Sequence, residues 1–430
     1  MVAMMSQHPA PQPAESPNQN SNLHHRLRRM VGRNPDERHR ASTPLELLFD
    51  LTLAIAFSQA GSQMAHLLQL GHYAHAIAAF VFAVFAVSWA WINFTWLASA
   101  FDNDGVFFRV ATLVQMIGVL VIALGLPDLF HSIDLGEHID TRVVVGGYVV
   151  MRMAVIALWI RASRHDPSQR RAATMYATLI AVAQVGWIAQ IAINPPFFVT
   201  VAVVLVLAAF ELMVPIIAER GGFGTPWHGH HIAERYGLLV IITLGEIVAG
   251  TILAISAVVQ EQGWSLEAAF VAFGGTAIAF GLWWVYFTMP SGEVLTRFRE
   301  RGFLWGYGHV VLFGSLAATG AGLHVAAGVI ENVTQIGPVA AVLTIVVPLA
   351  VFTVALFALY SLLLRHMDPF HLLLLAGSLA ALAACVIAVA AGASVGVGIL
   401  IAACAPVVVV VGYETVGHRH QADALERTLR

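Results

Sequence analysis

Apolar residues occur along most of this chain in runs of about 20 or more, the length that an α-helix needs to cross a bilayer. Short polar segments that hold most of the charged residues separate these runs. The pattern predicts an all-α polytopic membrane protein. We expect about twelve transmembrane helices, near residues 44–69, 74–100, 106–126, 143–161, 171–193, 197–218, 231–258, 266–289, 303–330, 336–364, 370–391 and 394–414.

The two ends of the chain lack such runs. Residues 1–42 are rich in Pro, Ser, Asn, Gln, His and Arg, and no apolar stretch there is long enough for the core of a signal peptide. We therefore expect residues 1–42 to form a disordered cytoplasmic head. Residues 415–430 are expected to form a cytoplasmic tail.

The composition narrows the classes of function. Only 11% of residues are charged, against about 25% in an ordinary soluble domain. The 22 basic residues face 25 acidic ones, so no basic stripe for nucleic acid is expected. Both cysteines, Cys385 and Cys404, lie in apolar runs and provide neither a disulfide framework nor a Cys-rich zinc site. The expected partner is the lipid bilayer, with no cofactor, metal or nucleic acid.

Arginine is concentrated in alternate loops, and arginine is retained on the cytoplasmic side of a membrane. The opposite loops hold Arg142 together with several acidic residues. Twelve helices therefore place both termini in the cytoplasm, and we expect a multi-pass protein of the bacterial plasma (inner) membrane. The cytoplasmic segments contain Arg26, Arg28, Arg29, Arg33, Arg38 and Arg40, then Arg161, Arg164, Arg170 and Arg171, then Arg220, then Arg297, Arg299 and Arg301, then Arg365, and finally Arg419, Arg427 and Arg430.

The two halves of the chain also resemble each other. Residues 49–59 match residues 236–246 in pattern, 91–95 match 284–288, and each half carries a Thr-Pro pair upstream. These matches indicate an internal duplication, with residues 43–218 and 219–414 as two parallel six-helix repeats that place a site between the halves. Chance similarity between apolar segments is the alternative.

Charged groups inside hydrocarbon cost at least about 2.5 kcal/mol each, so those retained usually face a cavity or a partner. Arg152 lies too deep to reach either surface, and Asp50, Glu211 and Glu246 are its possible counter-ions. A structural ion pair is the alternative to a pathway role. The candidates for a solute or ion pathway are Asp50, Gln59, Arg152, Glu246 and Tyr286.

Other polar residues are candidates for a gate or for ion pairs. Glu46 completes a capping box with Thr43, and Asp50 lies one turn deeper on the same helix face. His231 and Arg235 share a face of the seventh helix, and histidine titrates near neutral pH. A solvated helix entrance and a metal site at the neighbouring histidines are the alternatives. The full set is Glu46, Arg109, His231, Glu234, Arg235 and His309.

Large aromatic residues lie near the ends of two expected helices, one in each half. Interfacial anchoring explains such residues without a ligand. The residues are Trp89, Trp91, Trp96, Trp283, Trp284 and Tyr286. The spaced motifs of hydrolases, ATPases and kinases are not found, so no enzymatic activity is expected.

Several segments together resemble the bacterial low temperature requirement protein A family. They are Thr43–Leu51, Phe101–Asp104 with Arg109, Tyr148 with Arg152, His231–Leu238, Leu244–Glu246 and Trp284–Phe287. Leu48 and Thr52 depart from the family's usual first segment. The resemblance implies a polytopic membrane protein, but no activity or substrate. It singles out Glu46, Asp50, Arg109, Arg152, His231, Glu234, Arg235, Glu246 and Tyr286.

We expect a secondary transporter of a small solute, coupled to a proton or another cation. Glu246 would bind the coupling ion, Arg152 would pair with an acid, and the region from His231 to Arg235 would form the inner gate. One alternative is an ion channel, since Phe49-Asp50 resembles part of a signature of potassium channels built from six-helix repeats. Another is a membrane-embedded protein that handles a lipid or quinone. A homo-oligomer is also compatible with the sequence.

Overall fold

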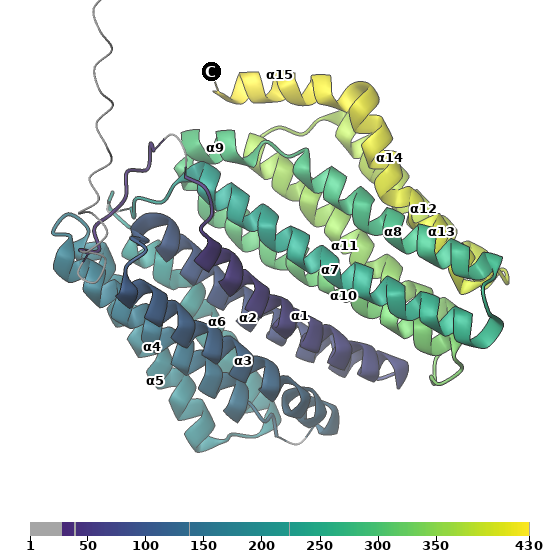
Figure 1. The fold of residues 1–430 in the computed structure, drawn as a ribbon, viewed down its shortest axis with the longest axis horizontal. Helices are drawn as coiled ribbons and strands as arrows, with labels where there is room; N and C mark the ends of the chain where they lie inside the picture. The colour runs from purple at the N-terminus through teal and green to yellow at the C-terminus, as the bar shows by residue number, and fades with distance from the viewer. Residues whose placement is uncertain (1–27, 38–39, 137, 223, 430) are drawn as a thin grey trace, which may run out of the picture.

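The computed structural model describes residues 28–37, 40–136, 138–222 and 224–429, and this part of the chain is helical without strands (Figure 1). The long helices are α1 (Pro44–Gln69), α2 (Tyr73–Phe101), α3 (Val106–Leu135), α4 (Arg142–His165), α5 (Arg170–Ile193), α6 (Phe197–Ala218), α7 (Gly229–Gln262), α8 (Leu266–Phe287), α10 (Gly302–Ile330), α11 (Pro338–Leu364) and α12 (Pro369–Ala390). The shorter elements are α9 (Ser291–Arg297), the 3₁₀ turn η2 (Arg299–Arg301), α13 (Val395–Ala402), α14 (Cys404–Gly412), the π-helical turn η3 (Tyr413–Gly417) and α15 (His418–Leu429).

The described residues contain 11 helical segments that are long and apolar enough to cross a membrane. α1 falls outside this set because Glu46, Asp50 and Gln59 interrupt its apolar sequence. Each expected transmembrane segment nevertheless coincides with a helix or, at residues 394–414, with α13 and α14 together. The expectation of an all-α polytopic membrane protein is therefore confirmed.

Prolines account for two differences from the expected helices. α3 does not end before Pro127 but continues to Leu135, which membrane helices tolerate because other groups satisfy the freed carbonyl. The last expected span is divided at Ala403 into α13 and α14. Pro406 has no N–H to donate four residues back to Ala402, and its ring crowds that carbonyl, so a continuous helix is disfavoured there.

The helices form two neighbouring groups, α1–α6 and α7–α14, which meet along α1, α7 and α10 (Figure 1). α10 is the most enclosed of these helices: 83% of its most apolar stretch is buried inside the protein. In α6 the buried share of that stretch is 22%. The interior of the protein therefore lies around α10, and α6 has an outer position. The division into two repeats remains a prediction.

The chain before α1 differs in part from the disordered head that was expected. The Met30 side chain is buried, and the Met30 N–H donates to Nδ1 of His165 at 3.0 Å. The Gly32 N–H donates to Asp166 at 2.8 Å, and Arg33 donates to the Asp102 carbonyl at 3.1 Å. Disorder is thus wrong for residues 28–37 and 40–42, because backbone and side-chain donors there find acceptors on the bundle. Residues 1–27, 38 and 39 lie outside the described residues.

The arginine-rich segments lie on one face of the protein, as the alternation along the chain requires. Arg29 donates to the His165 carbonyl at the end of α4, and Arg299 donates to the carbonyl of Thr225 ahead of α7. Arg301 donates to the Leu363 carbonyl near the end of α11. That this face is the cytoplasmic one remains a prediction.

Candidate functional site

Four ionisable side chains meet between the start of α1 and the start of α7, and we call them the α1–α7 cluster: Glu46, Asp50, His231 and Arg235. All four are fully buried, with 0% of the residue exposed. The i, i+4 spacing on each helix places both acids on one face of α1 and both basic groups on one face of α7. The facing pairs therefore join the two groups of helices.

Glu46 has two roles in this structure. Its side chain accepts from the Thr43 N–H at 2.7 Å, and the Thr43 hydroxyl accepts from the Glu46 N–H, so the expected capping box is present. The same carboxylate lies 3.4 Å from Nη1 of Arg235 and 3.3 Å from Nε2 of His231. The capping and ion-pair interpretations of Glu46 therefore hold together.

Asp50 forms the shortest ion pair of the α1–α7 cluster. Its Oδ1 accepts from Nη2 of Arg235 at 2.6 Å and from the indole N–H of Trp91 at 2.7 Å. Asp50 is the seventh residue of α1, and Arg235 is the seventh residue of α7. At about 1.5 Å per residue, the pair lies roughly 9 Å along both helices from the arginine-rich face.

Several polar atoms of the α1–α7 cluster are buried without a hydrogen-bond partner. They are Oε1 of Glu46, Oδ2 of Asp50, Nδ1 of His231, and Nε and Nη1 of Arg235. Buried polar groups are usually satisfied, so each such atom calls for an explanation, and a functional site is one of the recognised explanations. Oε1 of Glu46 and Nη1 of Arg235 lie 3.4 Å apart and pair with each other, whereas Oδ2 of Asp50 could receive a proton or a cation.

A second pair of charged residues, Arg40 and Asp102, lies between the α1–α7 cluster and the arginine-rich face. Arg40 is 3.9 Å from carboxylate oxygens of both Glu46 and Asp102. Burial lowers the pKa of Arg40 and raises the pKa of Asp102, because removal from water disfavours both charged forms. Arg40 therefore links the surface of the protein to Glu46.

An aromatic path extends from the α1–α7 cluster toward α8. Trp91 packs edge-on against Tyr236 at 4.7 Å, and the Tyr236 ring lies 4.9 Å from that of His309. The His309 Nε2 is 3.0 Å from the Tyr286 hydroxyl. The sequence candidates His309 and Tyr286 are thus hydrogen-bonded to each other and connected to Asp50 through ring contacts.

Arg152 belongs to a separate site within the first group of helices. It forms an ion pair with Glu211 of α6, and both side chains are buried. Glu211 also accepts from the Trp89 indole at 3.0 Å and from Gln184 at 3.3 Å. Of the three counter-ions considered from the sequence, Glu211 is the partner. Arg152 therefore does not join Asp50 or Glu246 at a common site.

Glu246 lies apart from both clusters. It is half-buried on α7, and Ser58 of α1 is the polar side chain beside it. Its own backbone carbonyl lies against Gly320 of α10. Glu246 therefore lies at the junction of α1, α7 and α10, about three helical turns beyond Arg235.

Three remaining candidates lie outside the buried clusters. Gln59 is half-buried on α1. Arg109 is exposed and pairs with Asp104 at 2.7 Å. Glu234 is exposed and accepts from the Ser42 N–H at 3.2 Å, which ties the segment before α1 to α7.

The interfacial interpretation of Trp89, Trp91 and Tyr286 is wrong. Trp89 and Trp91 are 0% exposed, and each donates its indole N–H to a buried carboxylate. Tyr286 is 5% exposed and is hydrogen-bonded to His309. Trp283 is 40% exposed and is consistent with an anchor. A buried indole supplies a single donor to an acid without adding charge, which explains why tryptophan accompanies both acids.

Sequence reasoning missed Arg40 and the contacts of Trp89, Trp91 and Gln184. Arg40 was assigned to a solvated head because it lies in a polar segment. The spacing of the tryptophans was a usable signal. Two side chains that are two residues apart on a helix project to different faces, so Trp89 and Trp91 had to contact different neighbouring helices.

The fold and these buried charges define a class: an all-α polytopic membrane protein with ion pairs inside its helix bundle. Residues 41–411 match the family model of the bacterial low temperature requirement A protein (LtrA). The chain belongs to this family, and the resemblance noted from the sequence is confirmed.

One curated relative matches part of the chain. It is described as "Uncharacterized protein RA0937" of Rhizobium meliloti (strain 1021) and is 26% identical over 302 residues, which cover 66% of this chain and 68% of the relative. No solved structure matches the chain.

Proposed function

We propose that this LtrA-family protein is a secondary transporter of a small solute, coupled to a proton or another cation through the α1–α7 cluster. The observation that supports the proposal is that Arg235 of α7 lies within 3.4 Å of Glu46 and 2.6 Å of Asp50, both on α1. This contact joins the two helix groups whose relative movement alternating access requires.

The charge balance of the α1–α7 cluster suits a coupling site. Two carboxylates share the Arg235 guanidinium, with His231 beside them, and the next arginine, Arg40, is divided between Glu46 and Asp102 at 3.9 Å from each. A proton or cation bound at the free Oδ2 of Asp50 would neutralise this acid and weaken its attraction to Arg235. Binding would thereby favour separation of α1 from α7.

The proposal assigns coupling to Asp50 rather than to Glu246, where the sequence had suggested it. Glu246 has the Ser58 side chain of α1 beside it and lies apart from the basic residues of the α1–α7 cluster, so neutralising it would break no ion pair between helices. Arg152 and Glu211 are both on helices of the first group, and we assign them to the stability of that group.

The test uses the purified full-length chain in vesicles that contain a trapped pH-sensitive dye. Inward gradients of sodium, potassium and a mixture of the common amino acids serve as probes. We expect at least one gradient to change the internal pH, and the Asp50→Asn variant to reduce that rate at least tenfold. Arg109→Gln, which alters an exposed pair, is the matched control and should retain the wild-type rate.

Two results would overturn the proposal. One is that none of these gradients changes the internal pH or drives uptake of radiolabelled amino acids, and the other is an Asp50→Asn rate equal to that of the wild type. Discrete current steps in planar bilayers, driven by voltage without a solute gradient, would replace the transporter with the channel alternative.

A further inference from the structure

Three arginines meet around the end of α4 on the arginine-rich face, and we call them the α4 arginine cluster: Arg29, Arg161 and Arg164. All three lie close enough to His165, the last residue of α4, for their charges to act on its imidazole. Arg29 donates to the His165 carbonyl at 3.2 Å, and Arg161 donates to the Arg28 carbonyl at 3.3 Å. Arg29 and Arg164 are exposed, and Arg161 is half-buried. The cluster therefore places three positive charges together where a ligand can reach them.

Two acidic residues in the adjacent loops have partners outside the α4 arginine cluster. Asp166 accepts from the Gly32 N–H at 2.8 Å and from the Ser168 hydroxyl at 2.6 Å. Asp104 pairs with Arg109 at 2.7 Å. Each carboxylate is thus bound to another group, and the charge of the cluster stays suited to an anionic ligand.

On α4, the arginine cluster stands at the head of an exposed apolar face. Met153 and Ile160 are 56% and 38% exposed, and Arg164 follows Ile160 by four residues. Positions at this spacing lie on one side of a helix. Arg164 therefore continues the apolar face of α4 out to the surface of the membrane.

The neighbouring helix α3 has the same arrangement, and the two helices lie side by side in the first group (Figure 1). The guanidinium carbon of Arg161 lies 4.8 Å from the centre of the Phe107 ring, which is 40% exposed at the start of α3. Apolar residues at helical spacing continue this exposed face along α3: Val110, Leu113, Ile117, Leu120 and Leu124. An arginine thus stands at the head of an exposed apolar face on both helices.

We propose that the α4 arginine cluster binds the phosphate of an anionic phospholipid whose acyl chains lie along the exposed faces of α3 and α4. Guanidinium groups match the geometry of phosphate oxygens and bind them through paired N–H groups. The distance from Phe107 to Ile117 is about 15 Å along the helix, which is about half of the 30 Å hydrocarbon core and so the depth of one leaflet. The headgroup and the chains of one lipid therefore meet matching groups on the same side of the protein.

The charge of the cluster selects the kind of lipid. Phosphatidylglycerol and phosphatidylcholine both contain a phosphate, but the choline ammonium of the second would lie among like charges. Basic pockets beside transmembrane helices are known to bind anionic headgroups. Membrane topology requires arginine somewhere in this segment, but it does not require one at the head of each exposed apolar face. The arrangement on α3 and α4 therefore favours a lipid with a net negative charge.

The test titrates the full-length protein, purified in detergent and freed of lipid, with dioleoylphosphatidylglycerol and with dioleoylphosphatidylcholine. Native mass spectrometry counts the bound lipids, and we expect the first phosphatidylglycerol to bind at least about tenfold more tightly than phosphatidylcholine. Arg161→Gln combined with Arg164→Gln should remove most of this preference. The matched control is Arg297→Gln combined with Arg419→Gln, which removes two exposed charges from α9 and α15 and should retain the preference.

Three results would overturn the proposal. They are equal affinity of the wild type for the two lipids, an unchanged preference in the Arg161 and Arg164 variant, and an equal loss in the control variant. Inorganic phosphate at millimolar concentration tests the other source of the same group: phosphatidylglycerol that stays bound supports a lipid site, and its displacement assigns the site to free phosphate instead. The comparison of the two lipids on the wild type needs no variant, and none of these measurements depends on transport.

Discussion

Arg235 donates to Asp50 across 2.6 Å, and this contact links the seventh helix of the chain to the first. The acceptor oxygen also receives the Trp91 indole, so α2 takes part in the same junction. Both charges are fully buried, and neither can exchange its partner for water while the helices stay together. The ion pair therefore acts as a connection between the two groups of helices.

Replacing one member of this pair should destabilise the protein strongly. In Asp50→Ala, Arg235 would remain buried with Glu46 as its nearest acid, at 3.4 Å. Removing one partner of a buried ion pair typically costs about 3–5 kcal/mol. Thermal unfolding in detergent should therefore show a marked decrease of the midpoint.

The double variant Asp50→Leu with Arg235→Met provides the control. Apolar replacement of both members of a buried pair is often neutral or stabilising, so part of the lost stability should return, although Glu46 then keeps only His231 and Arg40 as basic neighbours. Transport should not return, because the coupling groups are gone. A double variant as unstable as Asp50→Ala would show that Glu46 depends on Arg235 as strongly as Asp50 does.

The contact between Trp89 and Glu211 can be tested separately. Trp89→Phe removes the indole donor 3.0 Å from Glu211 while keeping an aromatic ring. Loss of a buried hydrogen bond to a charged group should reduce stability by about 1.5–3 kcal/mol. Trp283→Phe, at a residue that is 40% exposed, should change stability by no more than about 0.5 kcal/mol. Equal losses in the two variants would contradict the buried role of Trp89.

The membrane-spanning helices could be predicted well from the sequence because bilayer thickness fixes their length and apolar character. The capping box at Thr43 and Glu46 was predictable for a similar reason, since it depends on neighbours three residues apart. The shared faces of Glu46 with Asp50 and of His231 with Arg235 follow from helix geometry alone. Local rules therefore predicted most of the helices, and they predicted which residues of the α1–α7 cluster share a face on each helix.

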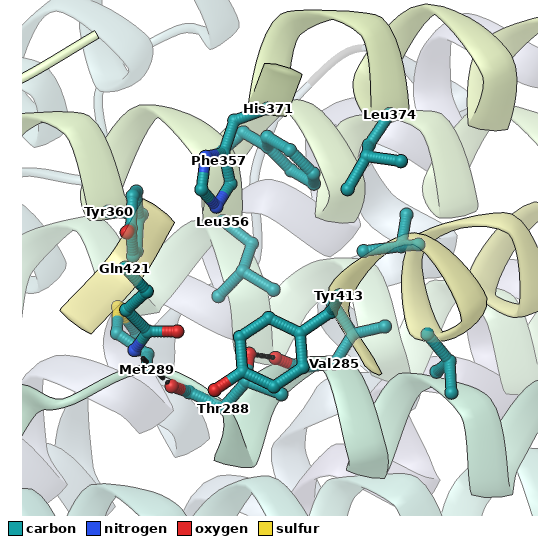
Figure 2. A pocket seen from close by; sticks show the side chains of 12 residues that line it. Val285, Thr288, Met289, Leu356, Phe357, Tyr360, His371, Leu374, Tyr413 and Gln421 are labelled. Carbon is teal, nitrogen blue, oxygen red and sulfur yellow. Dashed lines mark hydrogen bonds between the residues drawn. The ribbon is translucent and has the colours of Figure 1, made fainter. Parts of the chain in front are cut away.

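The partners across helices could not be predicted, because they depend on which helices approach each other and at what depth. Arg152 had three possible counter-ions, and only the packing of α4 near α6 selects Glu211. Trp91 looked like an interfacial residue because its place along α2 was known and its direction was not. The Tyr360 hydroxyl is buried without a hydrogen-bond partner, and no sequence pattern predicts this, since it depends on the side chains that surround the hydroxyl in the folded protein (Figure 2).

The docking of α15 should depend on Asp368. This carboxylate contacts His371 at 3.0 Å and His420 of α15 at 2.8 Å. Although burial raises the pKa of Asp368, hydrogen bonds from the Phe370 N–H and the two histidines lower it below the usual 3.8 overall. For an acid with a lowered pKa, the stabilising contribution is present above the unfolded value and is lost as the pH falls through the folded one.

Hydrogen exchange of residues 418–429 measures this docking. Exchange in the wild type should accelerate, after correction for the intrinsic rate, only below about pH 3.8. Asp368→Asn should show accelerated exchange already at neutral pH, because the charged partner of both histidines is absent. Asp423→Asn, a change on α15 itself, is the control. Identical exchange in Asp368→Asn and the wild type would contradict the role of Asp368 in holding α15.

The close approach of α7 and α10 depends on two glycines without side chains. A Cβ at Gly320 would lie 2.5 Å from the Glu246 carbonyl oxygen, and a Cβ at Gly250 would lie 2.5 Å from the Gly320 carbonyl oxygen. Both obstacles are backbone atoms, so the helices themselves would have to separate, and Gly320→Ala should cost about 1–3 kcal/mol. Gly245 lies on the same helix as Gly250, but a Cβ there meets nothing within 4 Å. Gly245→Ala should therefore leave the unfolding midpoint unchanged or raise it slightly, since alanine is the better helix former. Equal midpoints for Gly320→Ala and Gly245→Ala would show that α7 and α10 are free to move apart, and that the backbone contact at Gly320 does not limit their separation.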